Sequence, residues 1–98
     1  MTSSPPAAKV PYHPPVKRSL AIHGHKTSIS LEPVFWKMLK DAAAREGIAM
    51  AALAGRIDVE RIKADPAPGL AGAIRVWLVS DQAARACKGA AGSLPPPP

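Results

Sequence analysis

Polar and apolar side chains alternate between residues 26 and 31, which predicts a short β-strand. Because successive side chains of a strand point to opposite faces, Thr27, Ile29 and Leu31 share one face. A strand of about six residues cannot satisfy its own backbone hydrogen bonds, so it needs a partner strand. The simplest source of that partner is a second copy of the chain. The polar side chains of the other face are Lys26, Ser28 and Ser30.

A second extended run lies just upstream, over residues 17–22, and it also alternates. His23, Gly24 and His25 join the two runs, and a glycine between two extended segments favours a β-hairpin. The pattern therefore predicts strands over residues 17–22 and 26–31. A hairpin within one chain and a ribbon shared by two chains both stay open at this point.

The period changes from two to about 3.6 at Glu32-Pro33, which predicts a helix over residues 33–46. Pro33 suits the first helical position, where its missing N–H loses no hydrogen bond. Gly47 supplies the left-handed residue that ends a helix. The apolar stripe of this helix consists of Phe35, Met38, Leu39, Ala42 and Ala43.

Two further helices are predicted, over residues 49–63 and 70–87, on either side of a break at 65–69. Two prolines and a glycine in that break cannot continue a helix. Met50, Leu53 and Ile57 give the earlier helix an apolar face. Trp36 and Trp77 lie in apolar helical patterns and are expected in the core. The last helix has a broad apolar face, which consists of Ala73, Ile74, Trp77, Leu78 and Val79. Its charged residues Arg75, Asp81 and Arg85 are expected in water.

The 98-residue chain allows one small domain, predicted over residues 16–88. Residues 1–15 and 89–98 are rich in proline and small residues, a composition typical of disorder. The remaining core is marginal in size, and oligomerisation is a common remedy for a core of that size. Without a partner strand, the apolar strand face and the stripe of the first helix are expected to lie open to water. The fold class is therefore mainly α with a short β-ribbon, in a homodimer whose folding is coupled to association.

The net charge of +6 is distributed unevenly along the chain. Residues 1–31 carry four basic side chains and no acidic one, residues 32–65 are neutral, and residues 66–98 carry a net +2. The excess thus lies on the strands and on the segment before them. A protein that places its N-terminal region on nucleic-acid phosphates has this charge distribution.

Other chemistries receive little support from the sequence. Cys87 is the only cysteine, so an intrachain disulfide is impossible. His13, His23 and His25 lack the spaced cysteines or carboxylates that complete a recognisable metal site, so neither a metal nor another cofactor is expected. No nucleophile elbow or glycine-rich phosphate loop is present, so the protein is not expected to be an enzyme. No secretory signal or membrane span is evident, and we expect a cytoplasmic, nucleoid-associated protein.

The run from Lys17 to Glu32, KRSLAIHGHKTSISLE, followed by Phe35 and Trp36, resembles the ribbon-helix-helix domain family of small bacterial proteins. The later run AIRVWLV, residues 73–79, is similar as well, and the resemblance covers about residues 17–86. It implies an intertwined homodimer whose paired strands read the major groove of double-stranded DNA. The helix over residues 70–87 is extra to the minimal strand-helix-helix unit.

The resemblance assigns roles to particular residues. Lys26, Ser28 and Ser30 become the base-reading side chains. The start of the second helix lacks the Ser or Asn cap frequent in the superfamily, but its backbone N–H groups can still hold a phosphate. The residues expected on phosphate are Lys17, Arg18, Ala49, Met50 and Ala51. The residues expected in the dimer core are Ile29, Leu31, Phe35, Leu39, Leu53, Ile57 and Trp77.

The sequence thus predicts a sequence-specific DNA-binding protein, a transcriptional regulator that reads the major groove with a dimeric β-ribbon. The alternative is a protein-interaction module, antitoxin-like or an adaptor, which uses the helical dimer and the C-terminal helix to bind another protein. Salt-sensitive binding to DNA would favour the first interpretation over the second.

Overall fold

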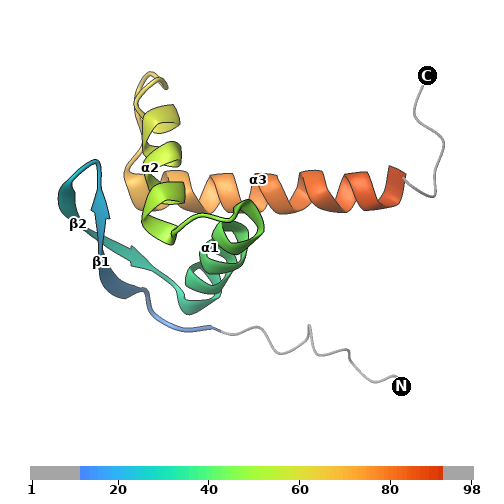
Figure 1. Ribbon diagram of the computed structural model, residues 1–98, viewed down its shortest axis with the longest axis horizontal. Coiled ribbons are helices and arrows are strands. Elements are labelled where there is room, and N and C mark those ends of the chain that lie inside the picture. Colours follow the sequence, from blue (N-terminus) through green and yellow to red (C-terminus); the bar gives the residue numbers. More distant parts are fainter. Residues whose placement is uncertain (1–11, 92–98) are drawn as a thin grey trace.

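The protein is described by a computed structural model, which covers residues 12–91 (Figure 1). An antiparallel pair of strands comes first and three helices follow, as the predicted fold class requires. Of the two ends expected to be disordered, residues 1–11 and 92–98 lie outside the described residues. The last helix runs to residue 91 instead of residue 87. The bounds are β1 Val16–Ile22, β2 His25–Leu31, α1 Pro33–Glu46, α2 Met50–Arg61 and α3 Leu70–Ala91.

The two strands form a hairpin in which Val16 pairs with Leu31 and Ile22 pairs with His25. His23 and Gly24 make the turn with φ angles of 53° and 80°. Positive φ at both central residues is what the two-residue type I′ turn needs, and this turn matches the twist of the strands. The partner of β2 is therefore β1 of the same chain. Of the two alternatives that the sequence left open, the structure has the hairpin within one chain.

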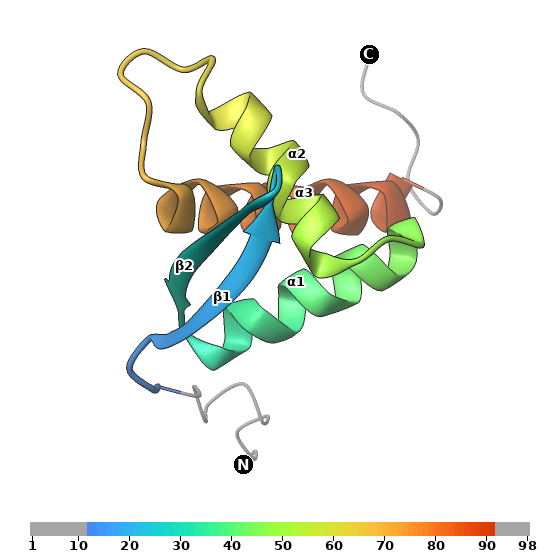
Figure 2. The ribbon, with the colours of Figure 1, turned by 60° about the vertical axis from the view of Figure 1, so that its left-hand side comes forward.

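One face of the ribbon packs on the helices and the other face is uncovered (Figure 2). Ile29 and Leu31 are 3% and 0% exposed, and they join a core that holds Leu39 of α1, Leu53 of α2 and Ile74 of α3. Because β1 supplies the partner strand, neither the apolar strand face nor the α1 stripe lies open to water in a single chain. Three helices on one two-stranded ribbon suffice to cover them.

Helix α1 begins and ends as the sequence predicts. Pro33 is its first residue, and Gly47 caps it in the left-handed conformation with φ 71°, donating its backbone N–H toward the carbonyls of Ala43 and Ala44. The buried aromatic residue, however, is Trp36 at 3% exposure, whereas Phe35 is only partly buried. Trp36 is thus in the core as predicted, and of the predicted stripe Leu39, Ala42 and Ala43 are buried.

Helix α3 packs with most of the predicted apolar face. Ile74 and Leu78 are buried and Ala73 and Trp77 pack against the core, but Val79 is 54% exposed. Arg75 and Asp81, which were expected in water, reach residues of other elements and form ion pairs there. These two side chains are therefore only partly exposed, whereas Arg85 is exposed as expected. Among residues 12–91, no helix has the length and apolar character needed to cross a membrane.

Candidate nucleic-acid interface

The uncovered side of the ribbon gathers six exposed residues, which we call the outer ribbon face. The strand register sets them in three cross-strand pairs, and alternation along each strand turns all six away from the helices. The predicted base-reading residues therefore share one face with Lys17. Ser19 also lies there and was missed; the two-residue turn, which fixes the register, was the signal that could have found it. The pairs are Lys17 with Ser30, Ser19 with Ser28, and Ala21 with Lys26.

Charge and size suit this face to the edges of base pairs. Lys17 and Lys26 lie at diagonally opposite ends, with the hydroxyl groups between them and no acidic residue on the face. Five residues of strand extend about 13 Å at about 3.3 Å per residue. A two-stranded ribbon fits the major groove, where ammonium groups donate hydrogen bonds and hydroxyl groups both donate and accept them.

The open end of the ribbon is attached to α1 through Trp36. The indole donates a hydrogen bond from Nε1 to the carbonyl oxygen of Val16, over 2.8 Å. Arg18, on the helix-facing side of β1, places its guanidinium carbon 5.2 Å from the centre of the same indole ring. This contact combines cation–π attraction with packing of the arginine stem. The start of β1 is therefore held against the helices.

Arg75 of α3 holds the end of β2. Its Nε donates to Oε1 of Glu32 over 2.9 Å, and its Nη2 donates to the backbone oxygen of Ser30 over 3.3 Å. The same guanidinium lies 5.8 Å from the centre of the Phe35 ring. A backbone hydrogen bond at Glu32, and then the hydrogen bond from Arg75, lower the pKa of the Glu32 carboxyl below its ordinary value. Sequence reasoning missed Arg75 because its partner lies 43 residues away.

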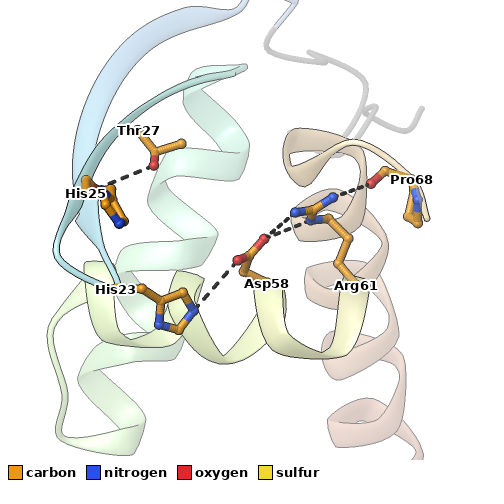
Figure 3. A network of polar contacts seen from close by, with 6 residues as sticks. All are labelled: His23, His25, Thr27, Asp58, Arg61 and Pro68. Atoms are coloured by element: carbon orange, nitrogen blue, oxygen red, sulfur yellow. Dashed lines mark hydrogen bonds and ion pairs between the residues drawn. The ribbon is translucent and has the colours of Figure 1, made fainter. Parts of the chain in front are cut away.

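The hairpin turn is attached to α2 (Figure 3). Nε2 of His23 lies 3.7 Å from Oδ2 of Asp58, and Oδ1 of the same carboxylate is 2.7 Å from Nη2 of Arg61. Arg61 also donates from Nη1 to the carbonyl oxygen of Pro68, over 3.1 Å. Both ends of the ribbon are thus anchored, so its outer face is presented by a fixed backbone. Such preorganisation reduces the ordering entropy that binding costs.

A second basic feature lies beside the ribbon, and we call it the basic groove. It is a hollow of about 410 Å³ whose walls include Arg18, Trp36, Lys37, Lys40 and Met50. Lys37 donates to Asp41 over 2.8 Å, while no ion pair of Lys40 is found within the part of the chain that the structure describes. The groove brings two of the residues expected on phosphate, Arg18 and Met50, next to Lys37 and Lys40 of α1.

The remaining residues expected on phosphate lie elsewhere. Lys17 is on the outer ribbon face, while Ala49 and Ala51 line a separate shallow hollow of about 480 Å³ beside Ala21 and His23. Ala49 precedes α2 without a side-chain cap, so the first N–H groups of α2 are free of a side-chain acceptor. The residues expected on phosphate therefore lie in three separate places and do not form one cluster.

The residues expected in the dimer core are found in the core of one chain. Five of them are at most 3% exposed, which requires no second copy, while Phe35 and Trp77 are partly buried against the same core. Among the described residues, no three His, Cys, Asp or Glu side chains gather as a metal ion would require. The five fully buried residues are Ile29, Leu31, Leu39, Leu53 and Ile57.

Known proteins share this architecture. Residues 15–81 match the family model described as a ribbon-helix-helix domain. A solved structure of an uncharacterized protein from Bordetella pertussis Tohama I is 30% identical, with a TM-score of 0.61. The match covers 83% of this chain and 62% of that chain, so this chain spans less than two thirds of the length of that protein. No curated protein matches the sequence.

Proposed function

The chain belongs to the ribbon-helix-helix domain family, and from that premise we propose that it is a sequence-specific DNA-binding protein that regulates transcription. Ribbon-helix-helix domains are typically DNA-binding regulators that dimerise. The observation that carries the proposal is the outer ribbon face, which is exposed, basic at both ends and free of acidic residues. A cytoplasmic, nucleoid-associated location follows from this function.

In this proposal the outer ribbon face enters the major groove. Lys26 donates to guanine O6 or N7, and Ser28 and Ser30 bond donor or acceptor edges of neighbouring bases. Lys17 and Ser19 of β1 lie on the same face and contact the adjacent base edges or the sugar-phosphate backbone. The anchors at Trp36 and at Arg75 support this assignment, because a ribbon that reads bases must hold its register.

The basic groove takes a backbone phosphate beside the ribbon in the same complex. Arg18 and Lys40 supply positive charge, and the uncapped start of α2 adds backbone N–H groups near Met50. Contacts of this kind fix the orientation of the protein on the duplex without reading sequence. They also release counterions and so make the affinity depend on salt.

Fluorescence anisotropy with a labelled pool of mixed duplexes, at about 50 mM and about 200 mM salt, tests the proposal. We expect binding that weakens steeply at the higher salt, and selection from the pool should yield a preferred sequence. The triple variant Lys26→Ala, Ser28→Ala, Ser30→Ala should lose that preference while it stays folded. A matched control is Lys63→Ala, since Lys63 pairs with Glu60 and lines neither the outer ribbon face nor the basic groove.

Two results would reject the proposal. One is no binding to any duplex at low salt. The other is unimpaired selection by the folded triple variant, which would mean that the ribbon does not read the bases. Either result would favour the interaction module, in which the helices bind another protein.

A further inference from the structure

A hollow of about 460 Å³ lies where the end of α1, one face of α2 and the first half of α3 meet, and we call it the Trp77 hollow. Residues 53, 56, 59 and 60 recur at helical spacing, so they share that face of α2. The size is near the lower end of the range for small-molecule sites, about 300–1,000 Å³, and favours one small ligand over a protein surface. The hollow is lined by Glu46, Leu53, Arg56, Val59, Glu60 and Trp77.

The apolar part of the Trp77 hollow is only partly covered by the core. Leu53 is 1% exposed, whereas Val59 is 40% exposed and Trp77 is partly buried. Covering such apolar surface is favourable, and an indole offers an aromatic face on which a flat ring can stack. None of these three residues lies on the outer ribbon face or in the basic groove. The hollow therefore suits a ligand with a large apolar side chain, above all an aromatic one.

Charges of both signs line the same hollow. Nη1 of Arg56 lies 3.3 Å from Oε1 of Glu46, and Oε2 of Glu60 lies 3.2 Å from Nζ of Lys63. The side chains of Arg56 and Glu46 are 60% and 52% exposed, so their ion pair contributes little to stability and a ligand can replace it at small cost. An anion would meet two carboxylates here, and a cation would meet a guanidinium. A ligand that carries both charges meets a partner for each of them.

We propose that the Trp77 hollow binds a free amino acid with a large apolar side chain. The ammonium and the carboxylate of an α-amino acid are attached to one carbon, so its two charges lie side by side, as those of Glu46 and Arg56 do. The ligand carboxylate accepts two parallel hydrogen bonds from the Arg56 guanidinium. The ligand ammonium donates to Glu46 and Glu60, and the apolar side chain lies against Val59 and Trp77.

Titration of the full chain with L-phenylalanine, without DNA, tests the site. The chain has two tryptophans, so a proton–nitrogen correlation spectrum shows two indole N–H signals, which the variant Trp36→Phe assigns. We expect the Trp77 signal to shift and to saturate at millimolar ligand. The Trp36 signal should stay in place, because Trp36 lines the basic groove and not the Trp77 hollow. A shift of the Trp36 signal alone would place the ligand in the wrong groove and overturn the proposal.

Three analogues separate the roles of the two charges and of the side chain. Phenethylamine lacks the carboxylate, phenylpropionate lacks the ammonium, and glycine lacks the ring. Each should bind at least about tenfold more weakly than L-phenylalanine. In Arg56→Gln, L-phenylalanine and phenethylamine should bind equally, because the guanidinium is the partner of the carboxylate. The matched control is Arg85→Gln, which also removes an arginine from an exposed ion pair, that with Asp81, but outside the hollow.

Three further results would overturn the proposal. They are an unshifted Trp77 signal at millimolar L-phenylalanine, equal affinity of the native chain for L-phenylalanine and phenethylamine, and undiminished binding by folded Arg56→Gln. The analogue series uses the native chain, so it remains decisive even if a variant fails to fold. The residues of the Trp77 hollow lie neither on the outer ribbon face nor in the basic groove, so failure here leaves the proposed DNA binding untouched.

Discussion

The indole of Trp36 donates a hydrogen bond to the backbone oxygen of Val16, joining α1 to the first residue of the ribbon. Trp36 is 3% exposed, so this bond lies at the edge of the core. Val16 pairs across the ribbon with Leu31, the last residue of β2. One buried side chain thus fixes the open end of both strands, on the side of the ribbon opposite to the outer ribbon face.

Two substitutions of Trp36 separate the contribution of its packing to stability from that of its hydrogen bond. Trp36→Phe keeps most of the buried apolar volume but leaves the Val16 oxygen without its donor, and it should cost about 1 kcal/mol of unfolding free energy. Trp36→Ala also creates a cavity and should cost about 3–5 kcal/mol. Urea denaturation followed by circular dichroism measures both. Equal losses in the two variants would show that the hydrogen bond, and not packing, dominates.

Glu32 should make the stability of the protein depend on pH. Its folded pKa is lowered by a backbone hydrogen bond and by Arg75, so its contribution is complete above the ordinary value of 4.5 and is lost as pH falls through the folded pKa. Glu32→Gln should therefore lose stability at neutral pH and lose less than the native protein on acidification. Urea denaturation of the native protein and of Glu32→Gln at neutral pH and at about pH 3 gives the difference in unfolding free energy between them at each pH.

Part of the acid sensitivity should remain in Glu32→Gln. The pKa of Asp41 is lowered too, by its hydrogen bond from Lys37. Asp81 behaves similarly, because hydrogen bonds from Arg45 and Arg85 outweigh the burial that raises its pKa. If the variant instead responds to acid as strongly as the native protein, Glu32 makes no contribution through its charge.

Lys40 should contribute to DNA affinity without contributing to sequence preference. It lines the basic groove and should contact a phosphate, so Lys40→Ala should weaken binding to all duplexes alike and reduce the salt slope by about one. Lys40 is a cleaner probe than Arg18, whose contact with Trp36 also supports the fold. Anisotropy titrations at several salt concentrations measure the slope, with Lys63→Ala as the control. An unchanged salt slope in Lys40→Ala would show that the basic groove does not contact DNA.

Local patterns were enough to predict the ribbon and the ends of α1. Alternation over residues 26–31 places Ile29 inward and Ser28 outward, and Pro33 and Gly47 act through their own backbone geometry. These features depend on near neighbours in the chain, so a single sequence contains them. The hairpin was one of two alternatives that the sequence left open, and the two-residue turn with positive φ at His23 and Gly24 decides in its favour.

Features that depend on distant partners could not be predicted. The helical pattern predicts that Trp36 lies in the core, but it does not predict that the indole donates a hydrogen bond to Val16, 20 residues away. The apolar pattern of α3 predicts its packed residues except at Val79, but it does not predict that Arg75 reaches Glu32, 43 residues upstream. The sequence therefore predicted the elements better than it predicted the contacts between them.

The base-reading role of the outer ribbon face gives the sharpest prediction. Lys26 is exposed at the turn end of the ribbon, and its ammonium can donate to guanine. Lys26→Ala should cost about 1–3 kcal/mol for the preferred duplex and relax the preference at one base pair per half-site. Selection from a randomised duplex pool, followed by titration of the preferred and single-mismatch duplexes, measures both effects.

Lys17→Ala provides the comparison, because Lys17 lies at the other end of the same face, opposite Ser30. If Lys17 contacts phosphate, its loss should weaken every duplex similarly and leave the selected sequence unchanged. Circular dichroism should show both variants folded, since neither side chain is part of the core. A selected sequence that is identical for the native protein and for Lys26→Ala would mean that Lys26 positions the ribbon and does not read a base.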